Sequence, residues 1–170
     1  LFASIAMYKT PVRTVEAVKK SLGGAVGVVL QMPFYAGIAG LISYNGGSTG
    51  VSIAQVIAGF FVHISNAQTF PLFTCLSAVI VKLFVPSGGA QWAVQGPIVM
   101  QAVQSFMPAV SEGKAAMALS WGNSCCNLLQ PFWLIPVLEV AKLKVRDVMG
   151  YCVICLIALL VIISAGLLFL

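Results

Sequence analysis

Apolar runs of different lengths, separated by short polar segments, cover most of the chain. No Lys, Arg, Asp or Glu occurs between Lys20 and Lys82. A membrane-spanning helix needs about 20 apolar residues, so this stretch alone has room for two or three membrane segments. A backbone surrounded by lipid must satisfy its own hydrogen bonds, which a helix does. The pattern therefore predicts an all-α integral membrane protein.

The N-terminal part predicts a surface segment that precedes the membrane domain. Thr10 and Pro11 are typical of a helix start, with an N-cap residue followed by proline at the first helical position. Apolar residues then recur at helical spacing, and basic residues occupy another face. We interpret residues 1–20 as an amphipathic helix on the cytoplasmic membrane surface. Residues 21–170 are interpreted as the membrane domain.

The apolar runs of this domain differ in length. Residues 21–43 and 148–170 are long enough to span the membrane, and the second of these is predicted to be the last span. Residues 51–64 are too short for an untilted crossing, so whether they cross is left open. Because the chain begins at Leu1 rather than Met, we expect it to be part of a longer protein.

A polar segment that breaks the helical pattern, Val85 to Trp92, lies between two of the apolar runs. Pro86 ends the first run, and Gly88 and Gly89 allow a chain reversal that leaves their amides uncovered. A helix that begins after the glycines points its first N–H groups at this segment, which is an anion-binding arrangement. We predict a re-entrant helical hairpin over residues 71–110, with the polar segment at its tip.

A second polar interruption, Trp121 to Asn127, divides the run of residues 115–140. We predict a broken helix over these residues. Irregular backbone at membrane depth survives only where protein surrounds it or where it lines a cavity. Two breaks of similar polar composition therefore favour a binding site over two packing kinks, although kinks satisfied by neighbouring helices are the alternative.

Two basic segments, Lys9 to Lys20 and Lys142 to Arg146, set the orientation because positive charge stays on the cytoplasmic side. An even number of crossings must separate them, and two arrangements satisfy this. In the preferred one, residues 71–110 enter and return on the outer side, which places the hairpin tip beside the broken helix. In the other, the crossing of residues 21–43 is followed by three full spans, residues 51–85, 92–110 and 115–140. This turns the tip into a cytoplasmic loop and explains Lys82 more simply.

The residues that could hold a ligand lie at the two breaks and are uncharged. Bare amides at helix ends within a membrane can hold a substrate carboxylate, and freed carbonyls can hold a coupling cation. The predicted substrate-binding residues are Ser87, Gly88, Gly89, Gln91, Asn123, Ser124 and Asn127. Lys82 could offset a substrate carboxylate or snorkel to the surface, and His63 could relay a proton or bond to the backbone.

Composition narrows the classes of function. The chain is 60% hydrophobic and 8% charged, and its net charge of +5 reflects membrane topology rather than nucleic acid binding. Cys152 and Cys155 form a C-x-x-C pattern inside an apolar run without a second pair. They are read as helix residues, and neither a metal nor a cofactor is expected. The absence of a nucleophile with a matching base argues against a membrane-embedded enzyme.

Four motifs resemble the bacterial short-chain fatty acid transporter family, the AtoE-like permeases. They are FVPSGGAQWAVQGP at residues 84–97, Trp-Gly-Asn at 121–123, NLLQPFW at 127–133 and RDVMGY at 146–151. The resemblance covers nearly the whole chain and corresponds to the C-terminal portion of such permeases. It implies a wider ion-transporter superfamily with inverted repeats, re-entrant hairpins and an elevator motion, so the chain would be one half of an inverted repeat.

The same resemblance implies a secondary transporter for short-chain fatty acids or similar small monocarboxylates, multi-pass in the bacterial inner membrane and not an enzyme. The implied partners are a small monocarboxylate, the lipid bilayer and the N-terminal half of the same protein, with a homodimer as a candidate assembly. The coupling ion, sodium or proton, is left open. The alternatives are a non-transporting membrane subunit or scaffold and, less favoured, a membrane-embedded enzyme.

Overall fold

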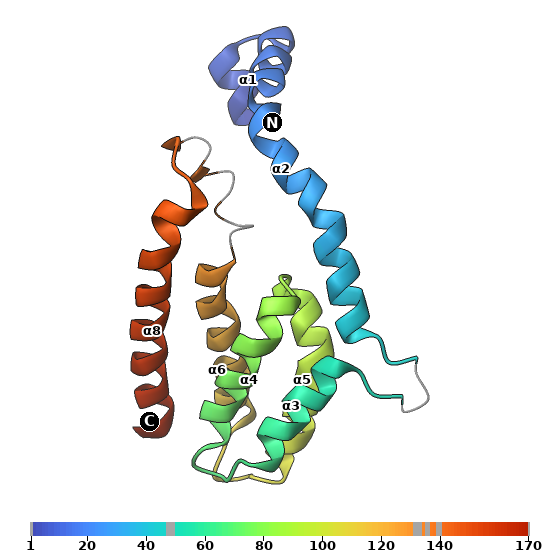
Figure 1. Ribbon diagram of the computed structural model, residues 1–170, viewed down its shortest axis with the longest axis vertical. Coiled ribbons are helices and arrows are strands. Elements are labelled where there is room, and N and C mark those ends of the chain that lie inside the picture. The colour runs from blue at the N-terminus through green and yellow to red at the C-terminus, as the bar shows by residue number, and fades with distance from the viewer. Residues whose placement is uncertain (1, 47–49, 131–133, 135–136, 139–140, 170) are drawn as a thin grey trace.

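The computed structural model describes residues 2–46, 50–130, 134, 137–138 and 141–169, and every regular element within these ranges is a helix. The elements are α1 (Phe2–Tyr8), α2 (Pro11–Ser43), α3 (Ile53–His63), α4 (Phe70–Phe84), α5 (Gly88–Gln104), α6 (Glu112–Cys126), the short 3-10 helix η1 (Asn127–Leu129) and α8 (Val145–Phe169). Figure 1 shows α3, α4, α5 and α6 grouped together, with α8 along one side and α2 descending from the top to reach the other side with its C-terminal part.

The start of α2 follows its local sequence. Lys9 adopts a left-handed conformation with φ 61° and ends α1. The Thr10 side chain accepts a hydrogen bond from the Arg13 N–H (3.4 Å), and Pro11 occupies the first turn. The helix then continues to Ser43 without a break at residue 20. The assignment of residues 1–20 to the membrane surface thus stays a prediction, because α2 runs continuously through residue 20 and marks no end of a surface segment there.

Helices α4 and α5 form an antiparallel hairpin. Figure 1 shows their connection near mid-height of the molecule, with the start of α4 and the end of α5 at the bottom. Pro86 explains why α4 ends at Phe84, because the residue before a proline avoids the helical conformation and Val85 has ψ 87°. Ser87 then caps α5, which begins at Gly88 rather than after the glycines.

Helix α6 runs through most of the segment where an interruption was predicted. Residues from Trp121 to Cys126 are helical, and the helix ends only at Asn127, so the predicted position of the break was wrong. Gly, Asn, Ser and Cys lower helix propensity by less than about 1 kcal/mol each and do not end a packed helix. Gln130 is extended (φ −96°, ψ 101°) because Pro131 follows it. Beyond Gln130, much of the predicted second half of this broken helix, up to residue 140, lies outside the described residues.

The close approach of α4 and α6 depends on one glycine. A Cβ atom placed on Gly122 would lie 2.2 Å from the Cys75 carbonyl oxygen and 2.9 Å from the Ala78 Cβ. Only a residue without a side chain permits this separation. The main apolar core lies beside this contact and consists of residues from α4, α5, α6 and the α5–α6 connection, namely Phe70, Ala78, Val99, Val103, Val110, Ala115 and Leu119.

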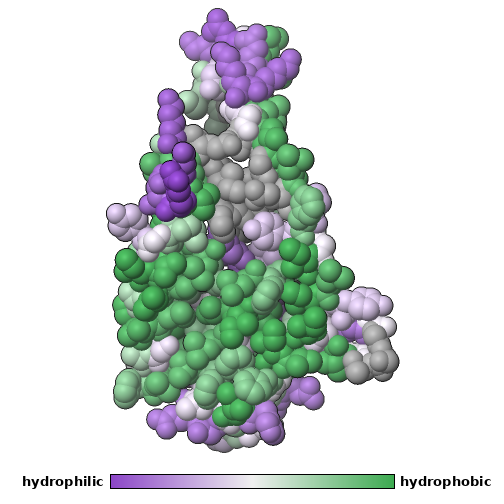
Figure 2. Space-filling model, in the orientation of Figure 1, coloured by the Kyte–Doolittle hydropathy of each residue, from purple (hydrophilic) through white to green (hydrophobic). Residues whose placement is uncertain are grey.

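The surface has the polarity expected for a bilayer environment. In Figure 2, hydrophobic residues cover the middle of the visible face, and hydrophilic residues gather at its top and bottom. Among the described residues, α8 is the one helix that is both long and apolar enough to cross a membrane. It covers the predicted last span of residues 148–170 up to Phe169, and Leu170 lies outside the described residues.

Candidate functional site

The tip of the α4–α5 hairpin presents the first turn of α5. The Ser87 Oγ accepts a hydrogen bond from the Ala90 N–H at 3.4 Å, and the Gln91 N–H bonds to the Ser87 carbonyl at 3.0 Å. The first N–H groups of a helix have no intrahelical partner. The amides of Gly88 and Gly89 are therefore the donors that the cap leaves for a ligand, and the Ser87 hydroxyl proton is a third donor.

A buried chain of polar side chains lies below the tip and joins three helices. Gln91 Nε2 donates to the Ala78 carbonyl (2.8 Å) and to Gln95 Oε1 (2.6 Å), and Asn123 Nδ2 donates to Gln91 Oε1 (2.7 Å). Gln95 Nε2 in turn donates to Ser77 Oγ (3.3 Å). Both glutamines are fully buried. Buried amides with satisfied donors and acceptors specify one arrangement of their helices.

This network changes the interpretation of two predicted ligand residues. Gln91 was predicted to bind substrate, but its amide is 0% exposed and bonds to α4, α5 and α6. Asn123 is half-buried, and a Cβ on Gly88 would lie 3.4 Å from its amide. The side chains of Gln91 and Asn123 thus join the tip to α6, and neither residue lines the cleft described below.

The other predicted residues of the second break lie in different surroundings. Ser124 is exposed on α6. Asn127 begins η1, and its buried Oδ1 atom has no hydrogen-bond partner among the described residues. The structure therefore brings Asn123 to the hairpin tip and leaves Ser124 at the surface. Asn127 lies at the end of α6, where its buried acceptor has an unused hydrogen-bonding capacity.

Lys82 is a buried cation at the end of α4. Its side chain is 2% exposed, and its ammonium group donates to the Pro86 carbonyl at the hairpin tip. Its own carbonyl accepts a hydrogen bond of 2.6 Å from Gln130 Nε2, which links α4 to the segment after η1. The ion pair found among the described residues is Arg146 with Asp147, at the surface. Within the part of the chain that the structure describes, the Lys82 ammonium has no carboxylate partner, and it lies directly beneath the tip.

The histidine predicted as a candidate proton relay lies away from these groups. His63 is exposed and is the last residue of α3. In Figure 1 this end of α3 points to the bottom of the molecule, whereas the hairpin tip is near mid-height. The arrangement gives His63 no contact with the tip.

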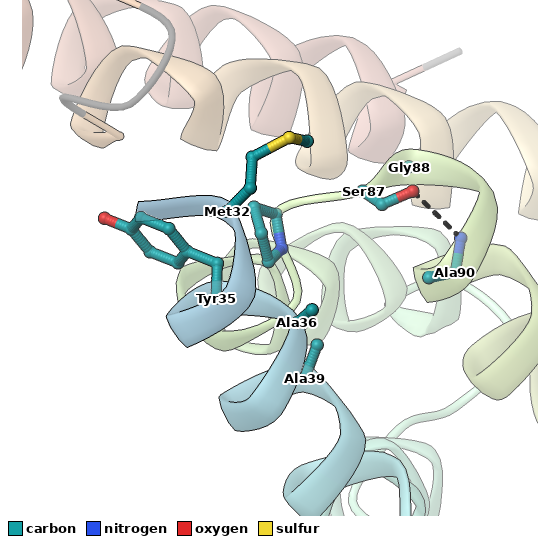
Figure 3. A pocket seen from close by; sticks show the side chains of 8 residues that line it. Met32, Tyr35, Ala36, Ala39, Ser87, Gly88 and Ala90 are labelled. Carbon is teal, nitrogen blue, oxygen red and sulfur yellow. Dashed lines mark hydrogen bonds between the residues drawn. The ribbon is translucent and has the colours of Figure 1, made fainter. Parts of the chain in front are cut away.

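A cleft of about 490 Å³ lies between the tip and α2. Its lining residues are Met32, Tyr35, Ala36 and Ala39 from α2, with Pro86, Ser87, Gly88 and Ala90 from the tip. Figure 3 shows Ser87 and Gly88 on one side of the cleft, and Met32, Tyr35, Ala36 and Ala39 along α2 on the other. The α2 wall was not predicted from the sequence. Its residues recur at intervals of three or four, which was the available signal.

Comparison with known proteins assigns the class of this membrane protein. A family model described as "Short chain fatty acid transporter" matches residues 1–170. The chain therefore belongs to the short-chain fatty acid transporter family. This confirms the family that the sequence motifs resembled.

Two relatives carry the name "Putative short-chain fatty acid transporter". The one from Escherichia coli is 36% identical over 167 residues, which are 98% of this chain and 36% of the relative. The one from Haemophilus influenzae is 35% identical over 170 residues, which are 100% of this chain and 36% of the relative. The chain thus spans about a third of the length of each relative. No solved structure matches it.

Proposed function

We propose that the full-length protein is a secondary transporter of short-chain fatty acids in the bacterial inner membrane. We further propose that the substrate carboxylate binds at the tip of the α4–α5 hairpin. The observation that carries this proposal is the cleft, which has Ser87 and Gly88 on one side and mostly apolar side chains of α2 on the other. Such an amphipathic cleft matches a ligand with an anionic head and a short hydrocarbon tail.

Three electrostatic features at the tip favour an anion. The first turn of α5 carries the positive end of the helix dipole. Its uncapped amides can donate hydrogen bonds to carboxylate oxygens, which are stronger than bonds to neutral acceptors. The ammonium group of Lys82 lies behind the tip, bonded to the Pro86 carbonyl. Intramembrane ionisable groups are usually functional, and here the substrate carboxylate would supply a negative charge near Lys82.

The arrangement of the helices supports a re-entrant placement of the hairpin. The start of α4, the end of α5 and the start of α6 lie at the bottom of the molecule, whereas α8 begins in its upper half and runs down to the same end (Figure 1). If α8 crosses the bilayer, the hairpin tip reaches mid-depth and turns back. The elevator motion and the inverted repeat that the family resemblance implies are part of this proposal, with the preceding portion of the full-length protein as the other half.

The proposed orientation can be tested by labelling from each side of the membrane. We expect single cysteines at Gly113 and Lys144, in a full-length background without the native cysteines, to react with a membrane-impermeant maleimide from opposite sides. Gly113 lies in the first turn of α6, and Lys144 directly precedes α8. The basic loop places Lys144 in the cytoplasm. Labelling of both positions from the same side would contradict the re-entrant arrangement.

The carboxylate site can be tested with Ser87→Ala. In liposomes containing the full-length protein, we expect this change to weaken the apparent affinity for radiolabelled butyrate about tenfold. A hydrogen bond to a charged group contributes at least about 1.5 kcal/mol, which corresponds to that factor. Ser105→Ala is the matched control, because Ser105 is exposed at the opposite end of α5. An unchanged affinity in both variants would place the carboxylate elsewhere.

A further inference from the structure

One face of α2 forms the apolar wall of the cleft. Met32, Ala36 and Ala39 are separated by four and three residues, so they lie on the same side of the helix. All three line the cleft opposite Ser87 and Gly88, as Figure 3 shows. With a rise of 1.5 Å per residue, the wall from Met32 to Ala39 extends about 10 Å along α2. The two alanines leave room that larger side chains would fill.

We infer that this face of α2 determines which chain lengths the transporter accepts, because it contacts the aliphatic tail of the bound carboxylate. The inference rests on the proposed function, since the carboxylate must bind at the tip for its tail to reach α2. The backbone amides and the Ser87 hydroxyl come from the hairpin, whereas Met32, Ala36 and Ala39 of α2 offer only hydrocarbon and a thioether, and Tyr35 adds one phenol hydroxyl. A monocarboxylate that spans the cleft therefore places its charged end at the tip and its methylenes along α2.

The affinity for a series of straight-chain acids should report this contact. Each methylene transferred from water to an apolar surface gains about 0.8 kcal/mol, or about fourfold in affinity. We therefore expect competition against acetate uptake to strengthen up to about fourfold per methylene from acetate through propionate to butyrate. The slope of affinity against chain length measures the contact of the tail with the α2 wall. The affinity for acetate, the shortest acid of the series, measures binding of the carboxylate at the tip.

Ala36→Leu in the full-length protein tests the inference. Ala36 is exposed within the cleft, so the larger side chain occupies the space of the tail. We expect acetate to compete nearly as well in this variant as in the parent protein. Butyrate has two more methylenes, and its affinity should fall about 15-fold. Gly37→Leu is the matched control, because Gly37 is not part of the cleft lining and a Cβ there meets nothing within 4 Å. It should keep the parental slope.

Met32→Ala provides a second test by removing atoms from the wall instead of adding them. Met32→Ala should also reduce the gain in affinity per methylene, since the tail loses part of the surface that it contacts. An unchanged slope in Ala36→Leu and Met32→Ala, or an equal loss for acetate and butyrate, would overturn the inference. Ser87→Ala could lower the affinity for every acid by the same factor while Ala36→Leu and Met32→Ala keep the parental slope of affinity against chain length. In that case the carboxylate site is supported and only the inference about α2 fails. If the parent protein takes up neither acid, both fail.

Discussion

Gly122→Ala is expected to prevent the normal association of α4 and α6 and to leave little folded protein. The added Cβ would lie 2.2 Å from the Cys75 carbonyl oxygen, which is part of the backbone and cannot rotate away. Overpacking a core usually costs about 1–3 kcal/mol, and here two helices must separate. Because Asn123 adjoins Gly122, the separation also disturbs the hydrogen bond from Asn123 to Gln91. We expect a total loss of stability above about 3 kcal/mol.

The measurement is size-exclusion chromatography and thermal unfolding of the full-length protein in detergent. Gly113→Ala is the matched control on the same helix, because a Cβ at Gly113 lies 4.0 Å from the nearest atom, Ser111 Oγ. Alanine is a better helix former than glycine, by up to about 1 kcal/mol, so this control should be as stable as the parent or slightly more so. If Gly122→Ala elutes and unfolds like the parent, the close contact between α4 and α6 is not present.

Lys82→Met is expected to reduce the apparent affinity for butyrate about 30-fold. The ammonium group is 2% exposed and lies beneath the hairpin tip, bonded to the Pro86 carbonyl. At an effective dielectric constant of about 20 and a separation on the order of 8 Å, two opposite unit charges attract by about 2 kcal/mol. Methionine has a similar length and no charge. The variant therefore removes the positive potential while it retains most of the side-chain volume.

Three comparisons separate an electrostatic role of Lys82 from a structural one. Lys82→Arg keeps the charge and should retain most of the affinity for butyrate. Lys114→Met removes a charge from the start of α6, away from the tip, and should behave like the parent. Butyramide, a neutral analogue, should compete equally in the parent and in Lys82→Met. If the methionine variant loses butyrate and butyramide to the same extent, Lys82 only supports the structure of the tip.

The sequence alone was sufficient where structure depends on neighbouring residues. Thr10 and Pro11 start α2, and Pro86 and Ser87 separate α4 from α5 in the way their backbone preferences require. The motifs also identified the family, since they are local patterns. The predicted position of the second break was wrong because polar residues were read as a break. Instead, α6 continues to Cys126, and η1 extends the helical backbone to Leu129, just before the Gln130-Pro131 pair.

Only the tertiary structure decided which polar residues meet. Gln91 and Asn123 are 32 residues apart, and nothing in their local sequence distinguishes a ligand from a partner in a buried network. Likewise, the α2 wall faces a tip more than 40 residues away along the chain. The sequence therefore determined the helix boundaries at Thr10 and Pro86, the family and the polar character of the tip. The packing of helices, which depends on contacts between distant side chains such as the one that Gly122 permits, determined the cleft.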